Sequence, residues 1–195
     1  GVQTCALPIS LKFDAVNDCT PISQLVKFPH VVVVHPSLPV RNIRELITLA
    51  KANPGKITFG SSGQGAIIHL STELFMEKAG IRMTHVPYRG GGPALNDVIA
   101  GQISLVFAPP QTGLPQAKAG RVRALAVTAK EPLAAEPDIP GMVQSGLPDF
   151  EVLSWHALIG PKGLPQAVIE RVNRDIGKTV QSREVEARVL ADGVS

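Results

Sequence analysis

This chain of 195 residues is poor in aromatic residues and in cysteine, and it has neither a cluster of basic residues nor a long hydrophobic run. Aromatic residues make up 4% of the sequence, and the net charge of +3 is spread along it. Nucleic-acid-binding surfaces usually combine a basic stripe with stacking aromatics, so we expect no nucleic-acid partner. The uncharged apolar run Val31–Val34 is far too short to cross a bilayer. A mild positive excess is compatible with an acidic small ligand.

The cysteines and the first ten residues carry no functional signal. Cys5 and Cys19 form no CxxC or Cys/His spacing that would indicate zinc, so we interpret them as unrelated thiols and expect no metal. Residues 1–10 (GVQTCALPIS) have neither the basic start nor the long apolar core of a signal peptide, and they do not resemble a first strand. We interpret residues 1–10 as an extraneous leader.

Extended and helical patterns alternate along the rest of the chain. Runs of β-branched and apolar residues bounded by Gly or Pro predict strands, and apolar residues at helical spacing predict helices. This alternation with short loops predicts an α/β fold with parallel crossovers. The expected strands are Val31–Val34, Ile57–Phe59, Met83–Val86, Ile103–Phe107, Val122–Thr128 and Val152–Ile159, and the expected helices begin near Asn42, Ala66, Pro93, Pro165 and Ser182.

Two of these helices carry specific local signals. Asn42 followed three residues later by Glu45 predicts a capping box at the start of the first helix. In the helix from Ala66 to Ala79, helical spacing places four apolar residues on one face, which we expect to be buried. These residues are Ile67, Leu70, Leu74 and Phe75.

The segment Gly60–Gly65 (GSSGQG) follows a predicted strand and opens a predicted helix. A helix N-terminus has unsatisfied N–H groups and a partial positive charge, which together favour an anion. Three enzyme motifs do not fit the segment. Ala66 stands where a P-loop needs Lys, Ile68 where a dinucleotide fingerprint needs a third small residue, and Gln64 where a nucleophile elbow needs Gly. The remaining interpretations are a loop that wraps a carboxylate and a tight turn without a ligand.

A second small-residue loop, Tyr88–Ala94 (YRGGGPA), also leads from an extended segment into a helix. Its glycines allow the backbone to approach a ligand closely, and Arg89 either contacts the ligand or is a solvated surface charge. Two such loops predict a cleft that holds a negatively charged small molecule from two sides. The expected ligand contacts in the loops are Ser61, Ser62, Gly63, Gln64, Gly65, Tyr88, Arg89, Gly90, Gly91, Gly92, Pro93 and Ala94.

Two residues outside the loops complete the candidate site. His69 either pairs with Glu73 four residues later or faces the cleft, and Trp155 either lies in the core or an interface or forms a cleft wall. No combination of Ser, His and acidic residues forms a recognisable catalytic set, so we expect no catalytic residues and no cofactor. We therefore predict a protein that binds organic anions. The alternative is an enzyme that acts on a carboxylated or phosphorylated metabolite and uses the same loops as its anion site.

The order of these motifs resembles the periplasmic substrate-binding proteins of tripartite tricarboxylate transporters, the Bug receptors. The resemblance is carried by residues 13–21, 35–39 (HPSLP), 60–63 (GSSG), 85–90 (HVPYRG), 92–94 (GPA), 125–128 (LAVT) and 154–155 (SW). It implies an α/β, two-lobed, type II periplasmic binding-protein-like fold that closes around a small carboxylate. It also implies a periplasmic monomer that delivers its ligand to the membrane subunits of the transporter.

The resemblance further implies how the chain divides. Residues 38–125 are expected to form one complete lobe, residues 11–37 part of the other lobe and a first crossing strand, and residues 126–195 the return strand and more of that lobe. The crossing strands are expected at 31–34 and 124–127. The second lobe is expected to be truncated and the signal peptide missing, as in a fragment.

The sequence departs from the family pattern at two positions. Ala108 follows the strand Ile103–Phe107 where the family usually has Asp, which argues against a preference for an amino acid such as aspartate. Cys19 stands where an aromatic residue is common, which we interpret as a change in packing.

Overall fold

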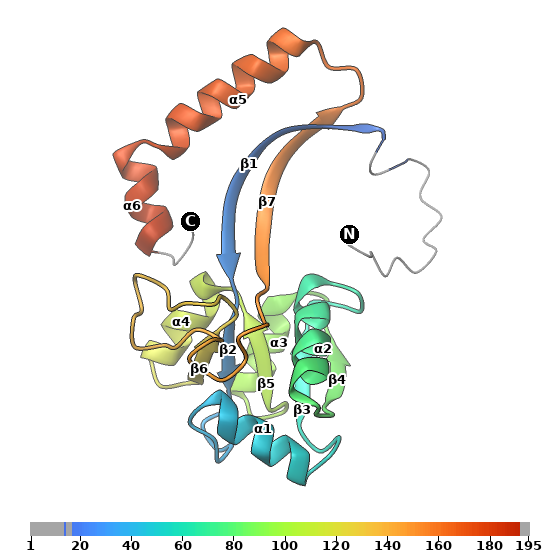
Figure 1. The fold of residues 1–195 in the computed structure, drawn as a ribbon, viewed down its shortest axis with the longest axis vertical. Helices are drawn as coiled ribbons and strands as arrows, with labels where there is room; N and C mark the ends of the chain where they lie inside the picture. The colour runs from blue at the N-terminus through green and yellow to red at the C-terminus, as the bar shows by residue number, and fades with distance from the viewer. Residues whose placement is uncertain (1–13, 15–16, 192–195) are drawn as a thin grey trace. The chain divides into compact units, whose positions relative to one another are not determined.

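The computed structural model describes Asp14 and residues 17–191, so the predicted leader at residues 1–10, with Cys5, lies outside the described residues. The chain divides into two compact units. One unit comprises Phe28–Ser154, and the other combines the chain up to Lys27 with the chain from Trp155 onward. Figure 1 labels the strands and helices of both units.

The Phe28–Ser154 unit is built on a five-stranded sheet with the order β4-β3-β5-β2-β6. Strand β3 runs parallel to β4 and β5, whereas β2 runs antiparallel to β5 and β6. The carboxyl ends of β3, β4, β5 and β6 therefore lie at one edge of the sheet, together with the start of β2. The strands are β2 (Val31–Val34), β3 (Thr58–Ser61), β4 (Thr84–Pro87), β5 (Leu105–Ala108) and β6 (Arg123–Val127).

Helices cover both faces of this sheet. Phe59 and Gly60 are neighbours in β3, so their side-chain positions face opposite sides. The Phe59 ring lies beside His69 of α2, and a Cβ at Gly60 would meet Ala94 of α3. Helices α2 and α3 therefore cover opposite faces. The helices of this unit are α1 (Ile43–Ala52), α2 (Ile67–Ala79), α3 (Gly91–Ile99) and α4 (Pro110–Lys118).

Aromatic rings fill the core beneath α2. Phe75 of α2 packs edge-on against Phe107 of β5, with ring centroids 5.7 Å apart, and against Phe150, with centroids 6.1 Å apart. All three rings are fully buried. Each buried aromatic side chain removes a large apolar area from water, so this cluster stabilises the packing of α2 on the sheet.

The capping box at the start of α1 is confirmed. The Glu45 N–H donates to Asn42 Oδ1 at 2.9 Å, and the Arg41 N–H donates to Glu45 Oε2 at 2.7 Å. The first bond satisfies a donor of the first helical turn, and the second ties the Glu45 carboxylate to the residue before the cap.

The expected buried face of α2 is wrong in part. Ile67 and Leu70 are 44% and 38% exposed, whereas Ile68 and Thr72 are buried together with Phe75. The hydroxyl of Thr72 donates to the Ile68 carbonyl oxygen at 2.9 Å, so a polar residue can be buried here without losing its hydrogen bond. The spacing of apolar residues alone therefore predicted part of the buried face of α2 incorrectly.

Helix α4 was not predicted, because Pro109 and Pro110 suggested only the end of a strand. In the structure Pro110 is the first residue of the helix. Proline suits this position because its fixed φ is helical and the first N–H of a helix has no partner within the helix.

The boundaries of the two units differ from the expected ones. Val31–Val34 and 124–127 were expected to cross between lobes, but both segments pair inside the five-stranded sheet, where β2 has a neighbour on each side. The strands that pass from one unit into the other are β1 (Cys19–Pro29) and β7 (Leu153–Pro161). They pair in a separate two-stranded sheet (Figure 1).

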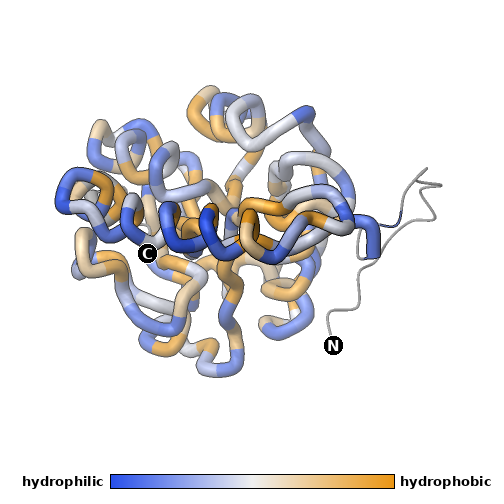
Figure 2. Tube along the Cα trace, turned by 90° about the horizontal axis from the view of Figure 1, so that it is seen from above, coloured by the Kyte–Doolittle hydropathy of each residue, from blue (hydrophilic) through white to orange (hydrophobic). Residues whose placement is uncertain are grey.

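The other unit adds two helices, α5 (Gln166–Val180) and α6 (Arg183–Ala191), to these strands. Helix α5 starts directly after Pro165, as predicted, and hydrophobic and hydrophilic residues alternate along it (Figure 2). None of its residues is fully buried.

Candidate functional site

The two glycine loops lie together at one edge of the five-stranded sheet. They follow β3 and β4, which are parallel neighbours. The Tyr88 N–H donates to the Ser61 carbonyl oxygen at 3.1 Å, and a Cβ at Gly91 would lie 3.4 Å from Ile68 Cδ1. In open α/β sheets ligands bind beyond the carboxyl ends of the strands, and both loops lie at such ends.

Each loop leads into a helix whose first turn has no side-chain cap. Helix α2 follows Ala66 and helix α3 follows Gly90, and neither residue caps its helix through a side chain. The first N–H groups of both helices are therefore available to a negatively charged group. Helix α4 begins at the same edge, but Pro110 has no N–H to offer there.

Glycine is required at three positions in these loops by backbone geometry. Gly63, Gly65 and Gly90 have φ of 128°, 78° and 136°, respectively. A residue with a Cβ adopts such values only with strain, so the loops depend on these glycines for their shape.

The Ser61 hydroxyl holds the first loop together. Ser61 is fully buried, and its Oγ lies 2.6 Å from His85 Nε2. The Gly63 N–H donates to this Oγ, and the Oγ is also within 3.1 Å of the Gly63 carbonyl oxygen. Ser62 and Gln64, by contrast, make no side-chain hydrogen bond within the described part of the chain, and Gln64 is exposed. The hydroxyl that remains for a ligand in this loop is that of Ser62.

His69 makes the helical pair that its position suggested, and its imidazole also contacts the first loop. Its Nε2 lies 3.3 Å from Glu73 Oε1, as expected for the helical pair, while its Nδ1 accepts the Gly65 N–H at 3.2 Å. The imidazole stacks on that of His85, with ring centroids 4.0 Å apart. His69 therefore ties the loop to helix α2.

His85 is a site residue that sequence reasoning missed. Burial lowers its pKa from the ordinary value, the nearby His69 lowers it further, and Glu73 acts in the opposite direction. The register of β3 and β4 places His85 opposite Phe59, and the two rings stack with centroids 4.9 Å apart. One indication of this role was present in the sequence, because His85 stands two residues before Pro87 at the end of a predicted strand that leads into the second loop.

The Tyr88 side chain ties the start of the second loop to helix α3. Its hydroxyl donates to Asp97 Oδ2 of α3 at 2.6 Å. Burial and this carboxylate raise the pKa of Tyr88 to about 12. Asp97 was also missed, since nothing in the sequence links it to a tyrosine nine residues earlier.

The remaining residues of the second loop differ in exposure. Arg89, Gly92 and Pro93 are exposed, whereas Ala94 is buried. Arg89 forms no ion pair within residues 17–191. Its guanidinium is therefore free to meet a ligand, while Ala94 packs the helix onto the sheet.

A buried histidine lies at the same edge, where β2 begins. His30 is 1% exposed, and its Nε2 lies 3.2 Å from the Ser154 Oγ. Its backbone N–H donates to Thr128 Oγ1 at 2.7 Å. Burial lowers the pKa of His30 to about 4, so the ring is neutral at physiological pH. Its Nδ1 is buried and has no hydrogen-bond partner in the described structure.

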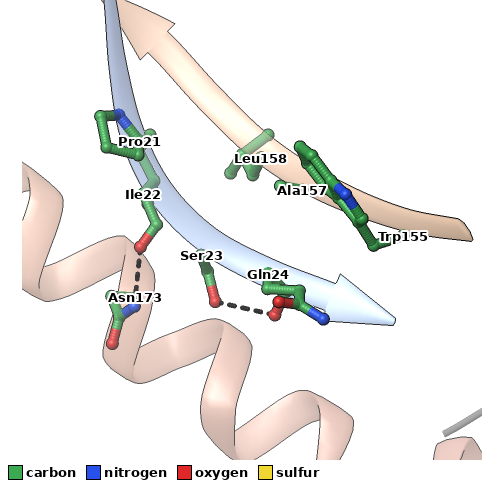
Figure 3. Close-up of a pocket in the computed structure, with 8 residues that line it drawn as sticks. All are labelled: Pro21, Ile22, Ser23, Gln24, Trp155, Ala157, Leu158 and Asn173. Carbon is green, nitrogen blue, oxygen red and sulfur yellow. Dashed lines mark hydrogen bonds between the residues drawn. The ribbon is translucent and has the colours of Figure 1, made fainter. Parts of the chain in front are cut away.

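Trp155, the remaining candidate, belongs to the other unit. It is 64% exposed and lines a hollow of about 440 Å³ there (Figure 3). The Asn173 side chain also lines this hollow and donates to the Ile22 carbonyl oxygen at 2.7 Å. The other lining residues are Pro21, Ser23, Gln24, Ala157 and Leu158.

The described residues hold neither a metal-binding cluster nor a membrane-spanning helix. Over residues 17–191, no group of three or more His, Cys, Asp or Glu side chains is placed to hold a metal ion. None of the described helices combines the length and apolar character needed to cross a bilayer.

Comparisons with known proteins point to one family. Residues 4–194 match the model of the tripartite tricarboxylate transporter family receptor, TctC. The chain is 37% identical over 170 residues to the UPF0065 protein in the tcbD-tcbE intergenic region of Pseudomonas sp. strain P51, covering 87% of this chain and 51% of that protein. It is 31% identical to BugT of Bordetella pertussis, covering 95% of this chain and 57% of BugT.

Solved structures agree with these matches. The structure of R. palustris Rpa4515 with adipate has a TM-score of 0.89 and 30% sequence identity, and the similarity covers 94% of this chain and 61% of that one. The predicted α/β, periplasmic binding-protein-like fold is therefore confirmed. The chain spans about half the length of the curated relatives it matches.

Proposed function

This chain belongs to the tripartite tricarboxylate transporter family of receptors, and on that basis we propose that the complete protein is a periplasmic receptor for a small carboxylate. The observation that carries the proposal is the pair of uncapped helix N-termini, behind Gly60–Gly65 and Tyr88–Gly90, at one edge of the sheet. The adipate in the related Rpa4515 structure supports the same ligand class. Because the family consists of receptors, the alternative of an enzyme has no support.

The loops favour an anion over a neutral ligand for a physical reason. Each helix N-terminus contributes about 0.3–1 kcal/mol toward a negative charge. Each hydrogen bond to a charged acceptor adds about 1.5–3 kcal/mol. A neutral sugar gains nothing from the first contribution and less from the second, so we infer a mono-, di- or tricarboxylate or a carboxylated aromatic compound.

The proposed contacts are the exposed groups of the two loops. Ser62 supplies a hydroxyl, the first turns of α2 and α3 supply N–H groups, and Arg89 supplies a positive charge. We further propose that the receptor is a monomer and delivers its ligand to the membrane subunits of a tripartite tricarboxylate transporter.

The proposal is tested on the full-length gene product with a panel of adipate, malate, citrate, benzoate and a neutral sugar. A carboxylate should raise the melting temperature and be recovered unchanged. Arg89→Ala should weaken its binding by about 1.5–3 kcal/mol, which is about ten- to hundredfold in Kd. Gly91→Val and Ser62→Leu should each abolish binding, because both add bulk where the ligand is expected and Ser62→Leu also removes a hydroxyl.

Matched controls separate binding from general damage. Arg82→Ala removes an exposed arginine at the opposite end of β4 and should leave the affinity unchanged. Ser62→Ala removes the hydroxyl without adding bulk and should weaken binding less than Ser62→Leu. Unchanged affinity in the three loop variants would place the site elsewhere, and a sugar that stabilises the protein more than every carboxylate would refute the ligand class.

A further inference from the structure

We propose that His69 and His85 are positioning residues, which hold the loop Ser61–Gly65 in its ligand-binding shape only while His69 is uncharged. The inference rests on the proposed function, since it concerns the same anion site. It assigns both histidines a place behind the loop and not in contact with the ligand. Acid should therefore release the loop and weaken binding.

The hydrogen bonds around Ser61 show how His85 acts. A hydroxyl has one hydrogen and two lone pairs. With a proton on His85 Nε2, this nitrogen and the Gly63 N–H both donate to Ser61 Oγ, and the hydroxyl donates to the Gly63 carbonyl oxygen. All three positions of the hydroxyl are then used. The imidazole thereby fixes Ser61, and Ser61 fixes the backbone of Gly63 at its positive φ.

His69 holds the other end of the loop through its second nitrogen. Its Nδ1 accepts the Gly65 N–H at 3.2 Å, so this nitrogen is unprotonated and the proton of the neutral ring is on Nε2. The Nε2 faces Glu73 at 3.3 Å. A second proton can bind only at Nδ1, where it would point at the Gly65 N–H. Protonation of His69 therefore breaks the bond to the loop.

The stacking of His69 on His85 makes the arrangement behind the loop more sensitive to the charge of the two rings. Their centroids are 4.0 Å apart, so two imidazolium ions would repel each other at close range. Helix α2 presents Glu73 to the pair, which favours one positive charge, and β3 presents the uncharged Phe59 and Ser61. The lowered pKa of His85 is consistent with a pair that resists a second charge.

The inference is tested first without any ligand, by NMR of the full-length gene product. The imidazole nitrogen shifts should show that the neutral His69 ring carries its proton on Nε2 and not on Nδ1. The amide signals of Gly63 and Gly65 should move with the titration of the histidines, and their hydrogen exchange should accelerate in acid. Amides that stay unchanged through this titration would overturn the inference.

Conservative variants distinguish positioning from general support of the fold. His69→Asn keeps an acceptor near the position of Nδ1, and His85→Gln keeps a polar group near Nε2. Both should retain the loop signals, and His69→Asn should remove their pH dependence. His69→Leu and His85→Leu keep similar bulk but lose the hydrogen bonds, so the loop amides should shift in both.

Binding of adipate, the first member of the panel above, provides the second readout. The Leu variants should bind about three- to tenfold more weakly than the wild type, as expected for one lost neutral hydrogen bond, while His69→Asn should stay close to the wild type. Binding that tightens in acid would overturn the inference, because the histidines would then act as charges on the ligand. If the loop amides respond as expected but no carboxylate binds, the positioning role stands and the proposed function fails.

Discussion

Replacing Gly60 with alanine is expected to destabilise the protein, although this residue opens a loop that the sequence associates with the ligand. Gly60 is buried and lies at the end of β3 with an ordinary backbone conformation, so alanine can adopt its φ. The destabilisation is expected because the neighbouring side chains leave no room for a Cβ. A Cβ at this position would lie 2.6 Å from Ile103 Cδ1 and 2.9 Å from Ala94 Cβ. Real Cβ atoms do not approach other carbons this closely, so the Ile103 side chain and α3 must both move.

The expected size of the effect follows from two opposing contributions. Overpacking a core typically costs about 1–3 kcal/mol. Replacing glycine by alanine favours the folded state by about 0.4–1 kcal/mol, because it lowers the conformational entropy of the unfolded chain. We therefore expect Gly60→Ala to lower the free energy of unfolding by about 1–2 kcal/mol. Because α3 must shift away from β3, the second glycine loop should move and carboxylate binding should weaken as well.

Urea unfolding followed by far-UV circular dichroism measures this change. Gly92→Ala is the matched control, since no atom lies within 4 Å of a Cβ there and the residue is in the first turn of α3. It should be neutral or slightly stabilising. Ile103→Val removes the methyl group that a Cβ at Gly60 would meet, so the double variant should lose less than the sum of the single ones, with a coupling of about 0.5–3 kcal/mol. Strict additivity, or a Gly60→Ala variant as stable as the wild type, would refute the packing argument.

Two further predictions concern titratable groups. The lowered pKa of His30, about 4, means that the unfolded chain binds a proton at higher pH than the folded one. Stability should therefore fall by about 3 kcal/mol as the pH drops from about 6.5 to 4, and His30→Gln should flatten this part of the pH profile in denaturant titrations. Tyr88 is the single tyrosine of this chain, and its absorbance should titrate near pH 12. Burial is the larger cause of this shift, so Asp97→Asn should lower the pKa of Tyr88 only in part, and an unchanged value would contradict the contribution of the carboxylate.

Much of the fold could be predicted from local sequence signals. The β-branched run Val31–Val34 forms a strand, and the Asn42–Glu45 capping box starts a helix, because each depends on residues close together in the chain. The family resemblance is confirmed by the match over residues 4–194. Local signals failed where a neighbour in space decided the outcome. Ile67 was expected in the buried face of α2, but the packed side of that helix carries Ile68 and Thr72. At Pro109 and Pro110 the reason was local, because proline also suits the first position of a helix.

The glycine loops themselves follow from the sequence, since small residues between a strand and a helix predict an uncapped helix N-terminus wherever the helix lies. The support behind the loops was decided by the tertiary structure. Ser61 meets His85 and Tyr88 meets Asp97 because β3 and β4 pair in a particular register and α3 packs back against the sheet. A sequence shows which side chains can form hydrogen bonds. The partners that they find depend on contacts between distant residues, which only the packed sheet creates. These contacts decide that Ser61 holds the loop and that the Ser62 hydroxyl stays unbonded within the described residues.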